Sequence, residues 1–246
     1  PHGIDLNQRS DGRYQLAVVN HMPRETIEMF ELINLNNSWS LVWRGCVDAP
    51  ELGYLNDVAL KGDGSFFTTH MYERGLSLLS LLYISFTKPD TGFVYQWDAG
   101  DGFTKVPNSD GSFPNGISIS DDEKNLFINY VFNHRTSKLN LENLNVEAEH
   151  FSKGTPDNSS IDGDFIWVAT QDNTGTDLLI HCDETVVQCS LPFTIFKLRQ
   201  SDLSEVASFS FSQTQMGSVT VAVTHKDKVW LGTFHGDRMA SFDNAN

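Results

Sequence analysis

The chain has 246 residues, and its charge and composition exclude several classes of protein. It carries 32 acidic against 17 basic residues, a formal net charge of −15, which repels phosphate backbones and argues against nucleic acid as a partner. The 39% of hydrophobic residues is enough for a core, and no apolar run approaches the roughly 20 residues of a membrane span. The length fits one large all-β domain over residues 1–246.

Five segments share one pattern, in which an alternating strand, a charged or glycine turn and a second, more aromatic strand follow one another. Their first residues are His2, Asn56, Asn115, Asp157 and Gly217. Alternation bounded by such turns predicts β-hairpins. The turns fall at Asp11-Gly12, Asp63-Gly64, Asp121-Asp122, Asp162-Gly163 and Lys226-Asp227. Self-similarity at a period of roughly 40–60 residues, with about four strands per unit, predicts the blades of a β-propeller.

Other segments complete the expected blades. Strand-like runs lie near residues 26–32, 92–97 and 193–198, and one segment, 72–85, is predicted to be helical. Five blades can close a ring, but a chain that opens directly on an inner strand is more typical of six blades with the first missing. We therefore expect an all-β, six-bladed β-propeller with five blades visible. About 60–100 further residues would lie upstream, as a companion N-terminal fragment or part of the same chain.

The first residues of the repeats predict a metal site. In a propeller the first strands line the central channel, so Asn56, Asn115 and Asp157 should converge there, and Asn158 adds a fourth oxygen. Amide and carboxylate oxygens without thiolates suit a hard cation, Ca²⁺ above Mg²⁺ or Zn²⁺. Polar residues at strand starts also serve as turn formers. Calcium sites usually contain more than one carboxylate ligand, so the upstream blade is expected to contribute another.

Histidines follow the second strands of several hairpins and should rim the same channel mouth as His2. They are His21, His70, His134 and His235. Histidines gathered beside a metal suggest proton transfer. The sequence has no G-x-S-x-G elbow, H-E-x-x-H motif, phosphate-binding glycine loop or dinucleotide fingerprint. The chemistry that the sequence predicts is therefore a metal-assisted reaction in which histidines act as general acid and base.

The three cysteines, Cys46, Cys182 and Cys189, have neither zinc spacing nor a C-x-x-C motif. Cys182 and Cys189 are placed to close a small disulfide loop in an oxidising compartment, while free, buried thiols are the alternative. The location stays open, with a secreted or periplasmic one favoured.

Short runs along nearly the whole chain resemble the paraoxonase/arylesterase family. They are Pro1-His2-Gly3-Ile4, Val18-Val19-Asn20-His21, Leu55-Asn56-Asp57, Asn115-Gly116-Ile117-Ser118-Ile119-Ser120, Asp157-Asn158 and Gly217-Ser218-Val219-Thr220-Val221-Ala222. The wider superfamily, which includes gluconolactonases and strictosidine synthase-like proteins, shares the six-bladed fold. The family's first blade, with its acidic pair, and its terminal cysteine pair have no counterpart in these 246 residues.

The resemblance implies a calcium-dependent hydrolase of small-molecule lactones or aryl esters, with one catalytic and one structural calcium. The implied ligands of the catalytic ion are Asn56, Asn115, Asp157 and Asn158, and the structural ion would lie near Asp57 and the carbonyl of Ile4. His2 and His21 match the family's histidine dyad, which is proposed to activate water. Calcium would polarise the carbonyl and stabilise the oxyanion.

Two alternatives stay open. One is a gluconolactonase-like or synthase-like enzyme of secondary metabolism, and the other is a non-catalytic binding propeller that uses calcium for stability. His2 and His21 together favour an enzyme. The choice of substrate is assigned to loops 73–82 and 175–189, whose sequences do not identify it.

Overall fold

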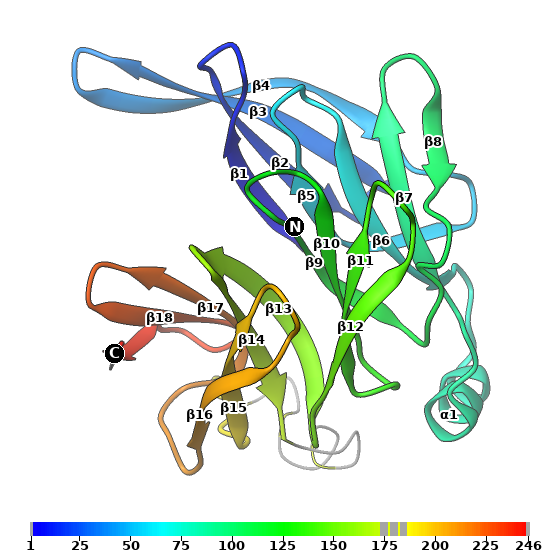
Figure 1. Cartoon of the computed structure of the whole chain (residues 1–246), viewed down its shortest axis with the longest axis vertical. Helices are drawn as coiled ribbons and strands as arrows, with labels where there is room; N and C mark the ends of the chain where they lie inside the picture. The colour runs from blue at the N-terminus through cyan, green and yellow to red at the C-terminus, as the bar shows by residue number, and fades with distance from the viewer. Residues whose placement is uncertain (1, 173–176, 178–181, 183–185, 245–246) are drawn as a thin grey trace.

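A computed structural model describes residues 2–172, 177, 182 and 186–244. Within them the chain forms five antiparallel sheets arranged as propeller blades (Figure 1). The expected all-β fold with five blades is confirmed. Each sheet keeps its strands in sequence order, because each strand pairs with the next one along the chain.

The first blade contains β1 (Ile4–Gln8), β2 (Tyr14–Asn20), β3 (Thr26–Leu35) and β4 (Ser38–Asp48). The second contains β5 (Gly53–Leu60), β6 (Phe66–Glu73), β7 (Phe93–Asp98) and β8 (Gly102–Lys105). The third contains β9 (Pro114–Ile119), β10 (Asn125–Tyr130), β11 (Arg135–Asn140) and β12 (Val146–Phe151). The fourth contains β13 (Thr155–Asp162), β14 (Phe165–Gln171), β15 (Phe193–Arg199) and β16 (Glu205–Phe211). The fifth contains β17 (Ser218–His225), β18 (Lys228–His235) and β19 (Ala240–Asp243).

The five predicted hairpins are the first two strands of each blade, and their turns fall where the sequence places them. Gly12, Gly64 and Gly163 have φ values of +85°, +91° and +55° in these turns. Residues with a side chain rarely adopt this conformation, which explains why glycine follows aspartate in three of the five repeats.

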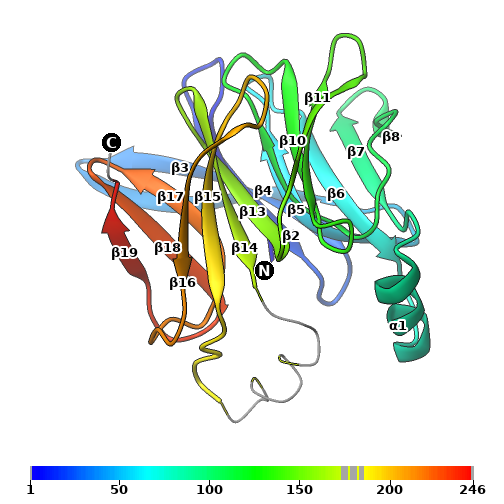
Figure 2. The ribbon, with the colours of Figure 1, turned by 60° about the horizontal axis from the view of Figure 1, so that its bottom comes forward.

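The helix predicted over residues 72–85 begins and ends later in the chain than expected. Helix α1 spans Leu78–Thr87, and Tyr72 belongs to β6, where it pairs with Tyr54 of β5. Ser77 caps the helix by accepting a hydrogen bond from the Ser80 amide, so the helix cannot start before this point. Figure 2 shows α1 at the periphery, beyond the second blade. No helix among the described residues is long and apolar enough to cross a membrane.

The hydrophobic core is divided among the contacts between neighbouring blades. Ala17, Val19 and Ile27 of the first blade pack against Leu55 and Val58 of the second. Equivalent clusters join the second blade to the third, the third to the fourth and the fourth to the fifth. Each blade is therefore stabilised by its neighbours, and the inner strands are held in a fixed position relative to one another.

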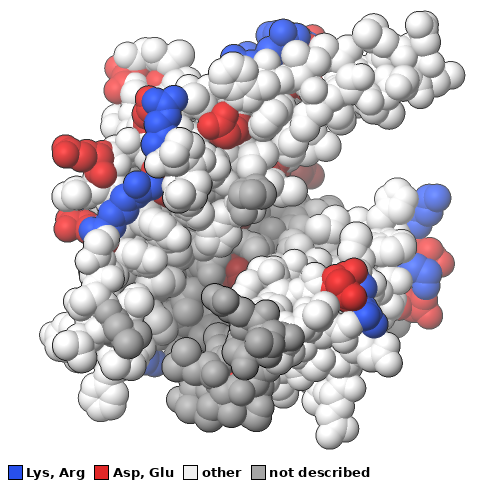
Figure 3. Space-filling model, turned by 180° about the vertical axis from the view of Figure 1, so that it is seen from behind, with Lys and Arg blue, Asp and Glu red and all other residues white. Residues whose placement is uncertain are grey.

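The outward faces of the first and fifth blades are apolar and uncovered. On the first blade, Leu6, Leu41 and Trp43 are 52%, 50% and 58% exposed, and on the fifth, Val223 and Trp230 are 47% and 39% exposed. These faces flank the gap between β3–β4 and β17–β18 in Figure 1, which is a notch in the molecular surface seen from behind in Figure 3. A monomeric surface rarely leaves apolar side chains gathered in this way.

Replacing Gly116 by alanine tests the close approach of neighbouring inner strands. A Cβ atom on Gly116 of β9 would lie 2.4 Å from the Asp157 carbonyl oxygen and 2.5 Å from the Asn158 Cα. We expect Gly116→Ala to lower the free energy of unfolding by about 1–3 kcal/mol, because backbone atoms must move. Gly100→Ala is the control, since its Cβ would meet only a flexible carboxylate oxygen at 3.3 Å. Equal loss in both variants, measured by denaturant unfolding, would contradict this packing.

Candidate active site

The polar residues singled out from the repeats lie near the beginnings of neighbouring inner strands, which are in direct contact. The Gly3 amide donates to the Asn56 carbonyl oxygen at 2.9 Å, which joins the start of β1 to β5. The Ile117 amide donates to Asp57 Oδ2 at 3.0 Å, which joins β9 to β5. Asn129 Nδ2 donates to the Asp157 carbonyl oxygen at 2.7 Å and joins the third blade to the fourth.

Asp57 is a buried carboxylate without a basic partner among the described residues. Burial raises its pKa to about 7, although hydrogen bonds from the Ile117 and Val58 amides oppose the shift, and Asp5 and Asp157 raise it further. Asp57 lies against the beginning of β1, because a Cβ atom on Gly3 would be 2.3 Å from its Oδ1. Ile4 therefore lies between Gly3, which is in contact with Asp57, and Asp5, whose charge raises the pKa of Asp57.

Asp157 is the second carboxylate of the site. Desolvation raises its pKa to about 7, although the residue as a whole keeps some exposure, and a 2.7 Å hydrogen bond from Gln171 Nε2 opposes the shift. The sequence analysis missed Gln171, which lies at the end of β14 and carries no motif. The Asp157 carboxylate is close enough to Asp57 for its charge to raise the pKa of Asp57.

The site concentrates oxygen acceptors without matching donors. Asn115 Oδ1 and Asn158 Oδ1 are buried and have no hydrogen-bond partner in the described part of the chain. Buried polar atoms are nearly always paired, so two unpaired amide oxygens beside two desolvated carboxylates call for a ligand that accepts oxygen lone pairs. A hard cation has this chemistry. The described residues contain no cluster of three or more His, Cys, Asp or Glu that suits a metal, so amide oxygens would form much of the ligand set.

His2 and His21 form a hydrogen-bonded pair that contacts Asn56 of β5. His2 Nδ1 lies 2.8 Å from His21 Nε2, and the other ring nitrogen of His2 lies 3.4 Å from Asn56 Nδ2. Burial and the nearby His21 lower the pKa of His2 to about 4, against an opposing effect of Glu25. The His2 ring is therefore neutral at pH 7, and its nitrogen next to Asn56 has the chemistry of a general base.

Glu25 is a site residue that the sequence analysis missed. Both of its carboxylate oxygens lie 3.0 Å from His21 Nδ1. The carboxylate also accepts from the Leu55 amide at 2.6 Å and forms an ion pair with Arg74 of the second blade. A glutamate four residues after a histidine matches no known signature, so only the folded chain identifies the contact.

The three other histidines expected at the channel mouth contact other groups. His70 is buried in the second blade, accepts from the Tyr54 amide at 3.3 Å and packs against Phe93. His134 Nδ1 contacts the Gly154 carbonyl oxygen at 2.9 Å, and His235 Nε2 contacts that of Val186 at 2.6 Å. Of the five histidines, only His2 and His21 are in contact with each other in the described residues.

Two of the three cysteines form a disulfide and are not free thiols. Cys182 and Cys189 are bonded, with their Cα atoms 5.0 Å apart, and Cys46 is free. Most of the loop 175–189, which was expected to influence substrate choice, lies outside the described residues. Cys189 itself is buried and lies next to the fifth blade, since its amide donates to the His235 carbonyl oxygen at 3.4 Å.

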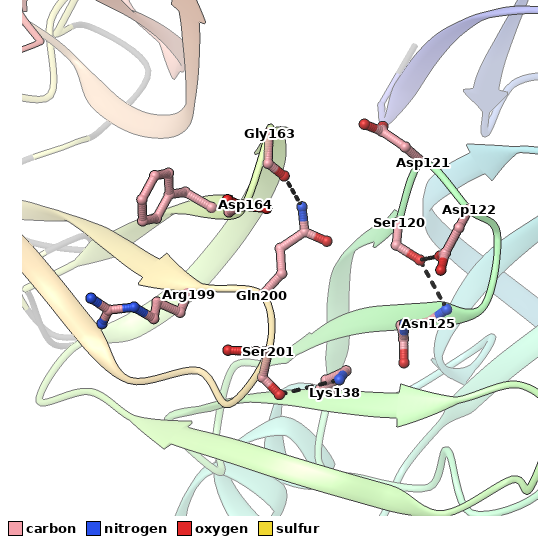
Figure 4. Close-up of a pocket in the computed structure, with 11 residues that line it drawn as sticks. Ser120, Asp121, Asp122, Asn125, Lys138, Gly163, Asp164, Arg199, Gln200 and Ser201 are labelled. Atoms are coloured by element: carbon pink, nitrogen blue, oxygen red, sulfur yellow. Dashed lines mark hydrogen bonds between the residues drawn. The ribbon is translucent and has the colours of Figure 1, made fainter.

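A cavity of about 500 Å³ lies at the opposite ends of the third and fourth blades (Figure 4). Its wall includes the β9–β10 turn with Asp122, and Asn115 is at the other end of β9. Hydrogen bonds pair several of its polar groups with one another, such as Lys138 Nζ with the Ser201 carbonyl oxygen and Gln200 with that of Gly163. This cavity is therefore separate from the histidine pair.

Five blades with a histidine pair and unpaired oxygen acceptors near the beginnings of their inner strands describe a propeller with a candidate active site. The arylesterase family model matches residues 1–239, and the chain belongs to this family. It is 26% identical over 251 residues to serum paraoxonase/arylesterase 2 of Gallus gallus and 28% identical over 250 residues to that of Homo sapiens. Each alignment covers 96% of this chain but 66% of the relative, so the chain spans slightly less than two thirds of these proteins.

Solved structures agree with the fold. A putative gluconolactonase superposes with a TM-score of 0.55 at 15% identity, over 97% of this chain and 73% of that chain. A gluconolactonase from Xanthomonas campestris gives a TM-score of 0.53 at 15% identity, over 92% of this chain and 67% of that chain. At this level of identity the likeness shows the propeller fold alone.

The raised pKa values of the carboxylates predict how stability depends on pH. The folded chain holds a proton on Asp157 up to about pH 7, whereas the unfolded chain releases it near the ordinary pKa of 3.8. The folded state thus binds more protons in this range, and its stability falls as the pH rises. In excess chelator, the stability of the wild type relative to Asp157→Asn should fall between pH 4 and 7 by at most about 4 kcal/mol.

Denaturant unfolding at fixed ionic strength measures this difference. Asp202→Asn is the control, because Asp202 is exposed and hydrogen bonds from Ser204 lower its pKa, so its contribution has the opposite sign. A pH-independent difference between the wild type and Asp157→Asn would show that the Asp157 carboxylate is not desolvated.

Proposed function

We propose that this protein is a calcium-dependent hydrolase of small-molecule lactones or aryl esters. Membership of the arylesterase family supports a hydrolase. The observation that carries the proposal is a pair of unpaired, buried amide oxygens on the inner strands β9 and β13, together with a neutral His2 that contacts Asn56 of the inner strand β5. The first feature fits a hard cation, and the second fits a base that removes a proton from water.

The proposed ligands of a catalytic calcium are Asn56, Asn115, Asp157 and Asn158. A second, structural calcium would be held by Asp57 and the carbonyl oxygen of Ile4. Bound calcium would polarise the carbonyl group of the ester and stabilise the negative charge that develops on its oxygen. The desolvated carboxylates support this assignment, because a cation offsets the cost of keeping them ionised.

The histidine pair supplies the proton transfers. Nε2 of His2 takes a proton from a water molecule, and the water oxygen adds to the carbonyl carbon. When the C–O bond to the leaving group breaks, His2 returns that proton to the departing alkoxide or phenolate oxygen. The products are a carboxylic acid and an alcohol or phenol, or a hydroxy acid from a lactone. His21 holds the His2 ring through the 2.8 Å hydrogen bond.

We also propose that a sixth blade, formed by residues upstream of this sequence, fills the notch between the first and fifth blades. The uncovered apolar faces on both sides of the notch support it, and so does the greater length of the relatives. The new blade would bury Leu6, Trp43 and Trp230, and an acidic residue on its inner strand would add a carboxylate to the metal site. A secreted or periplasmic location is proposed from the Cys182–Cys189 disulfide.

Calcium removal tests the proposed function. In the whole natural protein, excess EDTA should lower both the melting temperature and the hydrolysis of lactones and aryl esters, and added Ca²⁺ should restore both. A ligand at 100 times its Kd stabilises a protein by about 2.7 kcal/mol. Equal concentrations of Mg²⁺ should restore less, because Mg²⁺ demands a smaller octahedral site. An unchanged melting temperature in EDTA would contradict the calcium sites, and calcium binding without turnover of any substrate would indicate a binding propeller.

Replacing His2 separates proton transfer from metal binding. We expect His2→Gln to lower kcat by about 10²–10⁴-fold, the usual contribution of a general base. The rise in melting temperature on adding Ca²⁺ should persist, because the imidazole is not among the proposed ligands. His134→Gln is the control, since His134 contacts the Gly154 carbonyl oxygen away from the pair. Full activity of His2→Gln would exclude His2 as the base.

A further inference from the structure

We propose that Glu25 is a positioning residue for the histidine pair: its carboxylate fixes the tautomer of His21 and, through His21, leaves Nε2 of His2 without a hydrogen. The inference rests on the proposed function, because it assigns how the base of that reaction is prepared. Its physical content is a chain of hydrogen bonds from a buried carboxylate to the nitrogen next to Asn56.

The chain of contacts is continuous. Both Glu25 oxygens lie 3.0 Å from His21 Nδ1, His21 Nε2 lies 2.8 Å from His2 Nδ1, and His2 Nε2 lies 3.4 Å from Asn56 Nδ2. The two imidazole rings meet edge to face, with their centroids 5.0 Å apart. Each ring therefore uses one nitrogen on the side of Glu25 and the other on the side of Asn56.

The direction of these hydrogen bonds follows from the acceptor at one end. A carboxylate has no hydrogen to donate, so Nδ1 of His21 must donate to Glu25. In a neutral His21 ring Nε2 is then an acceptor, and Nδ1 of His2 must donate to it. The neutral His2 ring is left with a lone pair on Nε2. The contact at the far end agrees, because the Asn56 amide group is a donor and requires an acceptor there.

Glu25 is itself held in place by the second blade. Its side chain is only 4% exposed, accepts from the Leu55 amide and pairs with Arg74, which also donates to the Gly53 carbonyl oxygen at 2.9 Å. These two donors account for the carboxylate's remaining acceptor capacity. The carboxylate therefore cannot turn away from His21 without losing both partners.

The His21 ring is also fixed through its face. It stacks in parallel on Tyr54, with centroids 4.6 Å apart, and Tyr54 stacks on Tyr72 at 4.9 Å. The stack fixes the plane of the ring but leaves its tautomer open, because a π face does not distinguish the two nitrogens. The tautomer of His21 is therefore selected by its hydrogen bond to Glu25.

Nitrogen-15 NMR of the histidine rings in the whole natural protein tests the tautomers directly. In the wild type, His21 and His2 should both carry hydrogen on Nδ1 and none on Nε2. Glu25→Gln should lose this preference at His21, since an amide can donate as well as accept. Its kcat for a lactone or aryl ester should fall by about 10²-fold with little change in KM, and Glu25→Asp should recover part of the loss.

Glu31→Gln is the matched control. Glu31 is on the same strand, β3, and pairs with Arg44 at 2.8 Å, but it does not contact either histidine among the described residues. It should keep the wild-type tautomers and kcat. A merely structural Glu25 would lower the melting temperature of Glu25→Gln and leave the tautomers and the kcat of the folded fraction unchanged.

The outcomes separate this inference from the proposed function. An active wild type in which Glu25→Gln keeps kcat within twofold overturns the positioning role. A wild type with the expected tautomers but no hydrolysis of any lactone or ester supports Glu25 and overturns the hydrolase. If Glu25→Gln does not fold, the wild-type spectrum decides, and a hydrogen on Nε2 of His21 overturns the inference.

Discussion

The close contact of neighbouring inner strands determines how the blades and the candidate site are arranged. Each blade buries its apolar face against the next, and this packing brings β1, β5, β9 and β13 together near their beginnings. Glycine stands where the backbones meet, at Gly3 against Asp57 and at Gly116 against Asp157 and Asn158. Water is thereby removed from side chains that would otherwise be well hydrated.

Desolvation gives these side chains their chemistry. Asp57 and Asp157 have raised pKa values because they are enclosed without basic partners, and two asparagine oxygens are left unpaired in the described residues. Such an arrangement is costly unless something compensates it, and a hard cation does so with the least rearrangement. The same packing lowers the pKa of His2 and keeps that ring neutral. The proposed metal affinity and the neutral state of His2 thus have one physical origin.

The residues of the candidate site come from different blades. The histidine pair and Glu25 belong to the first blade, whereas the Leu55 amide and Arg74, which hold Glu25, belong to the second. Oxygen acceptors come from the second, third and fourth blades. A change in the packing between the first two blades therefore affects both the orientation of His21 and the proposed ligands Asn56 and Asp57, which contact the beginning of the first blade. The site is a property of the contacts between blades, and no single blade contains it.

The repeat, the hairpins and the residues at the beginnings of the inner strands could be predicted from the amino-acid sequence alone. Alternation and Asp-Gly turns are local, so β1–β2 and its four equivalents could be placed from the chain alone. Helix α1 was misplaced because the strand pairing of Tyr72 with Tyr54 and the cap at Ser77 are set by the surrounding structure. The burial of His70 and its contact with Phe93 were not predicted, since periodicity does not say which histidine is enclosed.

The contacts that lack a sequence signature depend on the folding of the whole chain. Glu25 and Gln171 join the site through hydrogen bonds to His21 and Asp157, and neither has a spacing that marks it. The partners of Glu25 come from another blade, and the uncovered faces of the first and fifth blades become visible only when the strands are paired in space. Local patterns specify strands and turns, whereas burial and hydrogen-bond partners depend on residues far apart in the chain.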